Sequence, residues 1–297
     1  MATSVVNKQR SSRLGSFLKL LRVKHYIKNA LIFFPLFFSK RIFEMPLLLK
    51  TIGGFAAFSL IASVIYIVND IRDVEENRAH PTKCNRPIAS GAIKVSSAII
   101  TAVLLFVLAI AIHYMCVGLQ WSGWALLLAY FGLNLGYSFG LKRIPLVDVT
   151  VLAAGFLLRM LYGSAITGIP LSAWLCLTTV VASFYLGFGK RRNEFTMDLD
   201  NKRQVLSAYS YAFLDKSMHM CMILALVFYS LWTLDVSNAP NAALIWTVPF
   251  LLLIVLKYNL NIEKNTDGDP TEVIFKDPVL LIMIALYAVT MFLTLYH

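Results

Sequence analysis

The chain has few charged residues and very few acidic ones. Of its 297 residues, 14% are Asp, Glu, Lys or Arg and only 16 are Asp or Glu, whereas 58% are hydrophobic. A composition this apolar excludes an ordinary soluble globular domain and indicates an integral membrane protein. The shortage of acids makes any cluster of them informative, because a carboxylate near lipid is costly without a cationic partner.

Paired cysteines are also missing. Cys84, Cys116, Cys176 and Cys221 lie far apart, with no CxxC pair. This spacing indicates neither a disulfide framework nor a zinc site, and we interpret all four as isolated small apolar residues. Residues 1–28 are polar and basic and contain no short apolar stretch that ends in a small-residue cleavage site. A cleavable signal peptide is therefore not expected.

The net charge of +11 has two interpretations. Lys and Arg hold cytoplasmic loops on the inner side of a membrane, and they also bind anionic lipid head groups or phosphates. Both interpretations apply, to different residues. Nucleic-acid binding is not expected, because the basic residues are dispersed among apolar segments rather than gathered on one soluble face.

Nine apolar segments approach the roughly 20 residues that a bilayer span requires. Because backbone polar groups need internal partners in lipid, each segment is expected to be helical. The predicted fold is an all-α polytopic membrane protein, a bundle of about nine transmembrane helices with a cytoplasmic-facing cavity. We expect a basic cytoplasmic N-terminal segment, residues 1–25, and a single transmembrane helical domain, residues 26–297. The sequence is also compatible with a homo-oligomer. The candidate spans lie near residues 26–43, 47–68, 95–116, 121–138, 146–167, 171–189, 208–235, 242–258 and 278–296.

The distribution of basic residues predicts the orientation. With the N-terminus inside, the cytoplasmic connections would be residues 69–94, 139–145, 190–207 and 259–277, which hold most of the Lys and Arg that follow the first span. Only Lys40, Arg41 and Lys50 fall on the outer side. This bias favours a cytoplasmic N-terminus and an external C-terminus. The loops 69–94, 139–145 and 190–207 are the expected functional loops, so the active site would face the cytoplasm.

Four of the sixteen acids fall within residues 69–78, directly after the second apolar segment. On a helix, residues three or four apart share a face, which would create a stripe of oxygen ligands. Such hard donors suit Mg²⁺, which takes one or two carboxylates and completes its shell with water and substrate phosphates. The stripe therefore predicts a Mg²⁺ site for a diphosphate, and the alternative is an acidic helix end paired with Arg72 and Arg78. Its members are Asn69, Asp70, Asp73 and Asn77.

A stiffened basic segment follows the acidic stripe. Pro81 and Pro87 are expected to break the helix, and Gly91 permits a turn. Lys83 and Arg86 are then held near the carboxylates. Cations beside a metal–diphosphate site can neutralise a leaving group as it departs. We therefore expect both side chains to contact substrate phosphates.

The acidic stripe and the basic segment after it resemble the signature of a known family. NDIRD followed by ENRAHPTKCNRPIASG is similar to the first signature of UbiA-type membrane transferases, N-D-x-x-D-x-x-x-D, whose aspartates hold Mg²⁺ on a diphosphate. Asn77 departs from that signature, so the resemblance implies Asp70 and Asp73 as catalytic metal ligands. The HPTK and RPIA continuation looks most like the decaprenyl-phosphate phosphoribosyltransferase branch. That branch implies phosphoribosyl diphosphate (PRPP) and a polyprenyl phosphate as substrates, in cell-envelope synthesis at a bacterial inner membrane.

The second long loop distinguishes the branches. Where aromatic prenyltransferases carry a second aspartate-rich motif, this chain has Gly189-Lys190-Arg191-Arg192-Asn193-Glu194. Three consecutive cations cannot form an acidic metal cage, but they can clamp a phosphate. The GKRxxE pattern resembles the phosphoribosyltransferase branch, so Lys190 and Arg191 are predicted to bind the acceptor phosphate or the donor 5-phosphate. The alternative is positive-inside anchoring, and Asp198 and Asp200 are interpreted as solvated loop acids.

Further candidates lie around the fifth span. The YSFGLKR element and the Asp that follows it are similar to the branch, which implies that Tyr137 and Lys142 bind substrate and that Asp148 orients a cation or a sugar hydroxyl. Arg159 lies inside a span, about three turns beyond Asp148 at ~1.5 Å per residue. An intramembrane Arg needs an anionic partner or a wet cavity, and a substrate phosphate is the partner that we favour over a buried acid.

Three more cations complete the substrate-binding candidates. Lys24 and Lys28 are four residues apart at the entry to the first span, where they can draw in an anionic lipid. The alternative for both is interfacial snorkelling. Arg72 lies within the acidic motif itself.

Two reactions fit the first motif. An allylic prenyl diphosphate and PRPP both lose pyrophosphate to give a stabilised carbocation, and both need Mg²⁺ on the leaving group. An aromatic acceptor needs no phosphate clamp, whereas a polyprenyl phosphate does. We therefore predict transfer of 5-phosphoribose from PRPP to a polyprenyl phosphate. The alternatives are a UbiA-type prenyltransferase that acts on an aromatic or other small acceptor, and a non-catalytic polyprenyl-phosphate carrier.

Overall fold

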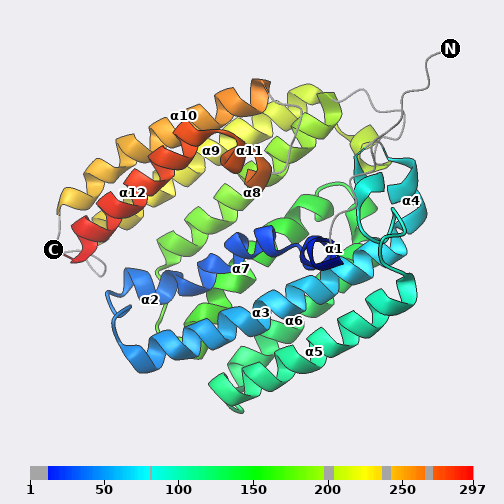
Figure 1. The fold of residues 1–297 in the computed structure, drawn as a ribbon. Helices are drawn as coiled ribbons and strands as arrows, with labels where there is room; N and C mark the ends of the chain where they lie inside the picture. The colour runs from blue at the N-terminus through cyan, green and yellow to red at the C-terminus, as the bar shows by residue number, and fades with distance from the viewer. Residues whose placement is uncertain (1–12, 81, 197–203, 236–241, 265–269, 297) are drawn as a thin grey trace.

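The computed structural model describes residues 13–80, 82–196, 204–235, 242–264 and 270–296, and within these ranges every regular element is a helix, as predicted. Pro81, Asp198, Asp200 and residues 1–12 of the predicted N-terminal segment lie outside the described residues. The elements, shown in Figure 1, are α1 (Arg13–Leu21), η1 (Val23–Phe33), α2 (Phe34–Phe38), α3 (Met45–Arg72), α4 (Val74–Ala79), η2 (Lys83–Asn85), α5 (Val95–Val117), α6 (Trp121–Phe139), η3 (Leu141–Arg143), α7 (Val147–Thr167), α8 (Ala173–Thr196), η4 (Gln204–Ala208), α9 (Tyr211–Leu234), η5 (Ala242–Trp246), α10 (Thr247–Lys264), α11 (Pro270–Lys276) and α12 (Pro278–Tyr296).

Seven of the nine predicted spans are long and apolar enough to cross a bilayer, which makes the chain a multi-pass membrane protein. They are α3, α5, α7, α8, α9, the segment Ala243–Glu263 and α12. The predicted span 121–138 forms α6, which carries Asn134 and three glycines among its apolar residues. The predicted span 26–43 is not one α-helix, because η1 is a 3₁₀ helix and α2 starts afresh at Phe34. The count of nine spans therefore stays a prediction.

Two helices continue further than their apolar runs predicted. α3 ends at Arg72, so residues 69–72 belong to the helix and not to the first loop. α8 ends at Thr196, so residues 190–194 lie on a helix rather than in a loop. On α8 the Arg191 guanidinium pairs with the Glu194 carboxylate one turn later, at 2.5 Å. Ion pairs of this spacing favour a helix beyond the apolar stretch that first defines it.

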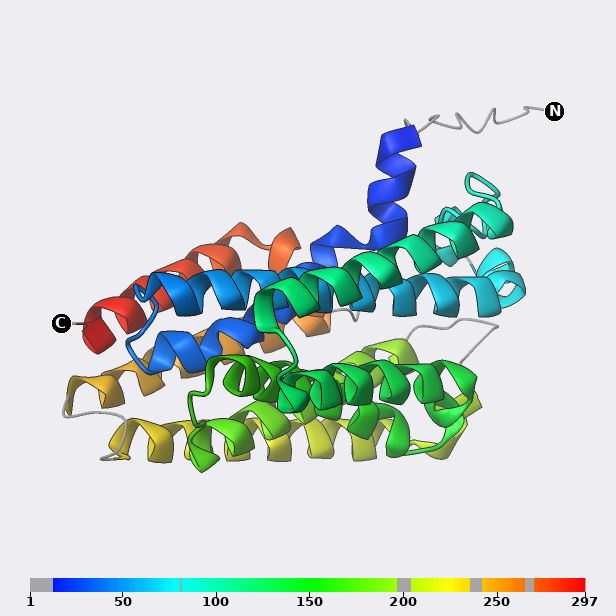
Figure 2. The ribbon, with the colours of Figure 1, turned by 90° about the horizontal axis from the view of Figure 1, so that it is seen from below.

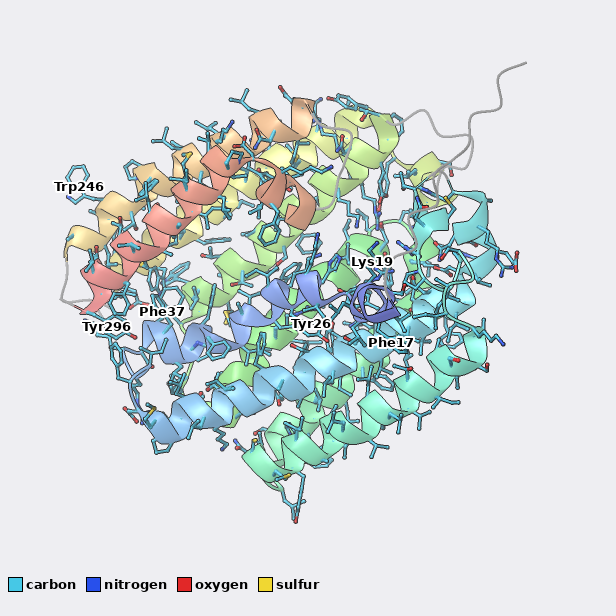
Figure 3. All side chains as sticks on the ribbon, in the orientation of Figure 1. Phe17, Lys19, Tyr26, Phe37, Trp246 and Tyr296 are labelled. Carbon is cyan, nitrogen blue, oxygen red and sulfur yellow. The ribbon has the colours of Figure 1, made fainter. Side chains whose placement is uncertain are left out.

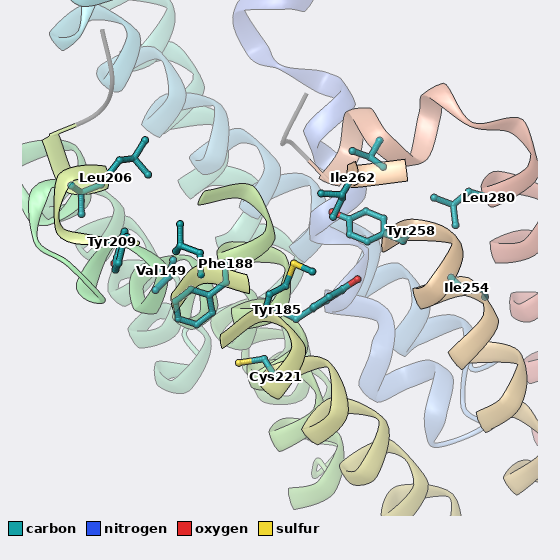
Figure 4. Packing of buried hydrophobic residues seen from close by; sticks show 14 residues of the cluster. Val149, Tyr185, Phe188, Leu206, Tyr209, Cys221, Ile254, Tyr258, Ile262 and Leu280 are labelled. Atoms are coloured by element: carbon teal, nitrogen blue, oxygen red, sulfur yellow. The ribbon is translucent and has the colours of Figure 1, made fainter. Parts of the chain in front are cut away.

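α3 is the central helix of the N-terminal half. In its most apolar stretch 67% of the residues are buried, against 17% for α5, which presents most of its surface outward as a lipid-facing helix would. α3 packs most closely against α5, and α8 packs most closely against α9. A hydrophobic cluster in the C-terminal half joins α7 through Val149, α8 through Tyr185 and Phe188, and α10 through Ile254 and Tyr258 (Figure 4).

The C-terminal helix α12 contacts the short helix α2. The Tyr296 hydroxyl, at the end of α12, donates a 2.9 Å hydrogen bond to the backbone carbonyl of Phe37 in α2, and Figure 3 shows the two side chains close together. Figure 2 shows α1 projecting away from the bundle. The chain turns from α1 into η1 at Arg22, whose backbone is left-handed (φ 52°, ψ 45°), a conformation that costs energy for a residue other than glycine.

The segment η1 packs against α7 with its own backbone. A Cβ atom placed on Gly163 would overlap the carbonyl oxygen of Ile32. Glycine is therefore required at this position for close approach, not for an unusual backbone angle. The contact fixes η1, with Asn29 one turn earlier, against the middle of the bundle.

Gly163→Ala is expected to destabilise the protein, because the added methyl can be accommodated only if the backbone of η1 moves. Overpacking of a well-filled interior costs about 1–3 kcal/mol, which would lower the thermal unfolding midpoint in detergent. Gly132→Ala is the matched control, since Gly132 is exposed on α6 and a methyl group added there would meet open space. Equal midpoints for the two variants would contradict the assigned contact.

Candidate active site

A cavity of about 690 Å³ lies between α3, α4, α6, α7, the end of α8 and η1. Among the residues that the structure describes, the lining carries two acids, Asp73 and Glu76. The cations around them are Arg22, Lys28, Lys83, Arg86, Lys142, Arg143, Arg159 and Lys190. A concave surface with this excess of positive charge attracts anionic ligands. Ten predicted site residues belong to the lining: Lys28, Asn69, Asp73, Asn77, Lys83, Arg86, Tyr137, Lys142, Arg159 and Lys190.

The predicted oxygen stripe forms along one face of α3 and α4. The backbone N–H of Asp73 donates to the carbonyl of Asn69 (3.0 Å), and the N–H of Asn77 donates to the carbonyl of Asp73 (2.8 Å). The helical register therefore continues across the junction of the two helices. Because these residues are four apart, all three side chains face the cavity.

Asp70 lies beneath this stripe and is 2% exposed. Its Oδ1 accepts hydrogen bonds from Arg22 Nη2 at 2.6 Å and from Arg86 Nη1 at 2.9 Å. Arg86 Nη1 also donates to Asn77 Oδ1 at 3.1 Å. Both oxygens of Asp73 accept from Lys142 Nζ at 2.7 Å. Each aspartate of the motif is thus neutralised by a cation of the chain itself.

The stripe fits a Mg²⁺ ion that is shared with a substrate. Among the described residues, no three His, Cys, Asp or Glu side chains lie close enough to form a complete metal site. Mg²⁺ does not need such a cage, because it usually binds one or two carboxylates and keeps water or substrate phosphates as its other ligands. Asp73 and the Asn69 amide face the cavity, with Asp70 beside them. This donor set suits an ion that is held between the protein and a diphosphate.

Arg159 marks the other end of the cavity, about 18 Å along α7 from its first residue at ~1.5 Å per residue. The side chain is 6% exposed. Its Nε donates to Asn29 Oδ1 (2.7 Å), its Nη1 to the Gly155 carbonyl (2.6 Å) and its Nη2 to the Tyr130 hydroxyl (2.8 Å). The prediction favoured a phosphate over a buried acid, and among the described residues no carboxylate pairs with Arg159.

The buried charge of Arg159 is therefore compensated only by neutral groups. Its guanidinium carbon also lies 4.8 Å from the centre of the Tyr130 ring and 5.5 Å from that of Phe156. Aromatic faces and carbonyl dipoles stabilise a cation in part, but an intramembrane charge of this kind marks a binding site by default. The site has room for an anion, because Arg159, Tyr130 and Phe156 all line the cavity.

Arg191 and Asp148 do not line the cavity, although both were predicted to bind substrate. Arg191 Nε donates to Asp148 Oδ2 at 2.5 Å, and both side chains are almost fully buried. Arg191 Nη2 contacts the Tyr137 hydroxyl at 3.3 Å, and Tyr137 lines the cavity. The three consecutive cations of α8 diverge, because helix residues one apart point in different directions. Lys190 faces the cavity, Arg191 pairs with Asp148, and Arg192 pairs with Asp215 of α9 at 2.7 Å.

Tyr209 extends this buried pair towards the loop that precedes α9. Its hydroxyl donates to Asp148 Oδ1 at 2.9 Å and accepts from the Leu146 backbone N–H at 2.6 Å. Burial, together with the neighbouring Asp148 carboxylate, raises the pKa of Tyr209 to about 12. The hydroxyl therefore keeps its proton at physiological pH and remains a hydrogen-bond donor.

Asp148→Asn is expected to destabilise the protein by about 3–5 kcal/mol, the cost of removing one partner of a buried ion pair. The Arg191 guanidinium would keep only Glu194, which is 23% exposed, as a charged partner. Thermal unfolding in detergent measures the loss. Asp215→Asn is the control, because its carboxylate is 31% exposed and should matter less. A larger loss for the Asp215 variant would contradict the reasoning.

Two other predicted residues lie away from the cavity lining. Arg72 is exposed, and its guanidinium stacks 4.4 Å from the centre of the Phe139 ring. Lys24 is exposed at the start of η1. Sequence reasoning also missed two contributors from the stretch before α2, Arg22 and Asn29, which contact Asp70 and Arg159. A polar Asn inside an apolar run was the available signal for Asn29, whereas Arg22 could not be distinguished from its basic neighbours.

Known proteins resemble this chain over most of its length. The model of the UbiA prenyltransferase family matches residues 31–277. A decaprenyl-phosphate phosphoribosyltransferase from Corynebacterium glutamicum is 34% identical over 278 residues, which cover 90% of this chain and 82% of the relative. A protein of the same name from Mycobacterium tuberculosis is 29% identical over 291 residues, 95% of each chain.

The fold is also that of solved family structures. A UbiA homolog from Archaeoglobus fulgidus bound to DMAPP and Mg²⁺ superposes with a TM-score of 0.70 at 17% identity, over 94% of this chain and 99% of that one. This likeness concerns the fold alone. Together with the family match over residues 31–277, it agrees with the resemblance that NDIRD and the basic segment after it indicated. The chain belongs to the UbiA prenyltransferase family.

Proposed function

We propose that this protein transfers a 5-phosphoribosyl group from PRPP to a polyprenyl phosphate and releases pyrophosphate. The observation that carries the proposal is the charge of the cavity, in which one short stripe of oxygen ligands is surrounded by eight cations. Lys190 stands on α8 where a second acidic motif would have to contribute a metal ligand. The relatives named decaprenyl-phosphate phosphoribosyltransferase support the same reaction.

The donor diphosphate belongs at the end of the cavity that holds the stripe. Asn69, Asp70 and Asp73 would hold Mg²⁺ there, and the ion would supply Lewis-acid stabilisation of the leaving pyrophosphate. Lys83, Arg86 and Lys142 approach the same place from η2, the turn after it and η3. These cations neutralise the negative charge that accumulates on pyrophosphate as the bond to the sugar breaks. The role of Asn77 is then to accept the Arg86 hydrogen bond.

The acceptor phosphate belongs at the opposite end, on Arg159. In a displacement at the sugar C1 atom, the attacking oxygen and the leaving oxygen lie on opposite sides of that carbon. A phosphate held by Arg159 deep in the bundle therefore faces a diphosphate held by Asp73 near the end of α3. The planar guanidinium offers two parallel donors that match phosphate geometry. Lys190 and Lys28 remain for the donor 5-phosphate.

The reaction forms one bond and breaks one. An oxygen of the acceptor phosphate bonds to C1 of ribose, the bond between C1 and the pyrophosphate oxygen breaks, and its electron pair leaves with pyrophosphate. Arg191 and Asp148 take no part in this step. Through the contact between Arg191 and the Tyr137 hydroxyl, the pair is a positioning element for a residue of the lining.

The proposed setting is a bacterial inner membrane, with the N-terminus and the cavity on the cytoplasmic side and the C-terminus outside. Lys142 pairs with Asp73, and Arg191 with Asp148, so η3, the α3–α4 junction and the ends of α7 and α8 meet at one end of the bundle. PRPP is a soluble phosphorylated sugar and would enter from that side. A homo-oligomer stays a prediction.

The direct test is a transfer assay with purified protein, Mg²⁺, PRPP labelled in its sugar and a polyprenyl phosphate. The expected result is a labelled lipid that is extracted into organic solvent, and its loss when EDTA removes the metal. The reaction fails as proposed if no labelled lipid forms while a prenyl diphosphate and 4-hydroxybenzoate yield a prenylated product. Binding and transport of the lipid without any product would instead indicate a carrier.

A further inference from the structure

The two aspartates of the acidic motif are already occupied by cations of this chain. Asp70 accepts from Arg22 at 2.6 Å and from Arg86 at 2.9 Å, and Asp73 accepts from Lys142 at 2.7 Å. These are the lengths of charge-assisted hydrogen bonds, the stronger kind in proteins. A divalent cation that arrives alone must displace guanidinium and ammonium groups that already neutralise the carboxylates.

The same three cations face the place where a diphosphate would bind. Arg22, Arg86 and Lys142 belong to the cavity lining, although Asp70, their most buried partner, does not. Their side chains are 18%, 27% and 14% exposed, so each has surface left for a ligand. Arg22 and Arg86 can present their fork of N–H donors to phosphate oxygens. One set of cations therefore serves two alternative partners.

We infer that the site works by an exchange of partners. Without ligand, Arg22, Arg86 and Lys142 neutralise Asp70 and Asp73. When a metal–diphosphate complex binds, the carboxylates take the metal in place of these cations, and the cations take phosphate oxygens in place of the carboxylates. The inference rests on the proposed function for its diphosphate substrate, and it adds that the metal site becomes complete only when the diphosphate is present.

Arg22 is the member of the set that lies before the acidic motif in the sequence. It precedes η1, 48 residues before Asp70, at the left-handed turn between α1 and η1. Its guanidinium carbon lies 4.7 Å from the centre of the Tyr66 ring, on the helix that carries Asp70. Because the backbone at Arg22 is strained and the side chain spans two elements, its position is held by these contacts rather than by local preference. This makes Arg22 a ligand-binding residue rather than a chance surface cation.

The exchange makes metal and diphosphate cooperative. The hydrogen bonds that Asp70 and Asp73 give up lower the affinity for Mg²⁺ alone, and the bonds that the released cations form with phosphate recover that loss. By linkage each ligand raises the affinity for the other by the same factor, and such factors are about 5–150. Removal of a competing cation should therefore change the two affinities in opposite directions.

The test is isothermal titration calorimetry of the full-length protein in detergent, with Mg²⁺ alone, inorganic pyrophosphate alone and the Mg²⁺–pyrophosphate complex. In Arg22→Gln, Mg²⁺ alone is expected to bind about 5-fold or more tightly than in the wild type, and the complex about 5-fold or more weakly. Damage to the fold would weaken both. Arg22→Lys keeps a point charge without the fork, and it should give smaller changes in the same two directions.

A second variant tests the exchange from the acid side. Asp70→Asn releases Arg22 and Arg86, so pyrophosphate without metal should bind more tightly than to the wild type, and Mg²⁺ alone more weakly.

Arg41→Gln is the matched control for Arg22→Gln, because it also removes one positive charge. Arg41 pairs with Glu44 at 2.6 Å in the connection between α2 and α3 and does not line the cavity. All three affinities should stay at their wild-type values there.

The inference is overturned if Arg22→Gln leaves the affinity for Mg²⁺ alone unchanged or lowers it, or if Asp70→Asn does not gain affinity for free pyrophosphate. Pyrophosphate is the leaving group of PRPP and of a prenyl diphosphate alike. A positive calorimetric result together with a failed phosphoribosyl-transfer assay would therefore refute the proposed substrate and leave the exchange standing. A negative calorimetric result together with a successful phosphoribosyl-transfer assay would refute the exchange and leave the proposed substrate standing.

Discussion

Asp73→Asn is expected to lower the turnover of phosphoribosyl transfer by about 10²–10³-fold, similar to the cost of removing one preorganised group that stabilises charge in a transition state. Asp73 is the only aspartate of the motif that lines the cavity among the described residues. The Asn side chain keeps the shape and one oxygen but loses the negative charge that Mg²⁺ prefers. Single-turnover assays with labelled PRPP at saturating Mg²⁺ measure the change, and excess metal should recover little of it.

Glu75→Gln is the matched control for Asp73→Asn. Glu75 lies two residues further on, is 78% exposed and pairs with Arg78 at 2.8 Å, away from the cavity lining. Its replacement removes the same charge from the same stretch of helix and should change turnover by less than about 2-fold, because exposed ion pairs contribute little. Similar losses in both variants would mean that the negative charge of the whole segment matters, not a specific metal ligand.

The second large effect is expected at the other end of the cavity. Arg159→Met should lower kcat/KM for the polyprenyl phosphate by about 30-fold or more, which corresponds to the ~2–5 kcal/mol lost when one partner of a buried charge pair is truncated. The affinity for PRPP should change by less than about 2-fold, because the donor diphosphate binds some turns away. Arg159→Lys should lie between, since it keeps the charge without the fork.

One outcome would contradict the role assigned to Arg159. If Arg159→Met weakens the binding of PRPP and leaves the acceptor unaffected, the two ends of the cavity have been assigned in reverse, and the guanidinium holds the donor 5-phosphate. Arg41→Gln again controls for the loss of one positive charge from the protein. Thermal unfolding of each variant separates lost binding from lost folding, because Asn29 and Tyr130 also lose a hydrogen bond when Arg159 is replaced.

The fold and the acidic stripe were accessible from the sequence because each is a local pattern. Apolar length predicted the helices, and spacing by four placed Asn69, Asp73 and Asn77 on one face, where the structure has them. Contacts between residues far apart in the sequence could not be predicted from such local patterns. The basic run of α8 could be recognised as unusual, but only the helix direction separates Lys190 in the cavity from Arg191 in a buried pair.

The N-terminal segment shows the same limit. Hydropathy predicted a span at 26–43, whereas the structure has the 3₁₀ helix η1 followed by α2. The backbone of η1 packs on Gly163, a tertiary contact that hydropathy does not report. Arg22 and Asn29 contact Asp70 and Arg159, and no spacing in the sequence relates these residues to one another.

The 3₁₀ winding of η1 also determines how far the segment reaches. A 3₁₀ helix rises about 2.0 Å per residue against about 1.5 Å for an α-helix. The seven residue-to-residue steps from Arg22 to Asn29 therefore extend about 14 Å rather than about 10 Å. That stretched rod carries a contact to Asp70 near one end and a contact to Arg159 at the other. A single backbone segment thus joins the two binding ends, and its 3₁₀ winding separates them further than an α-helix of the same residues would.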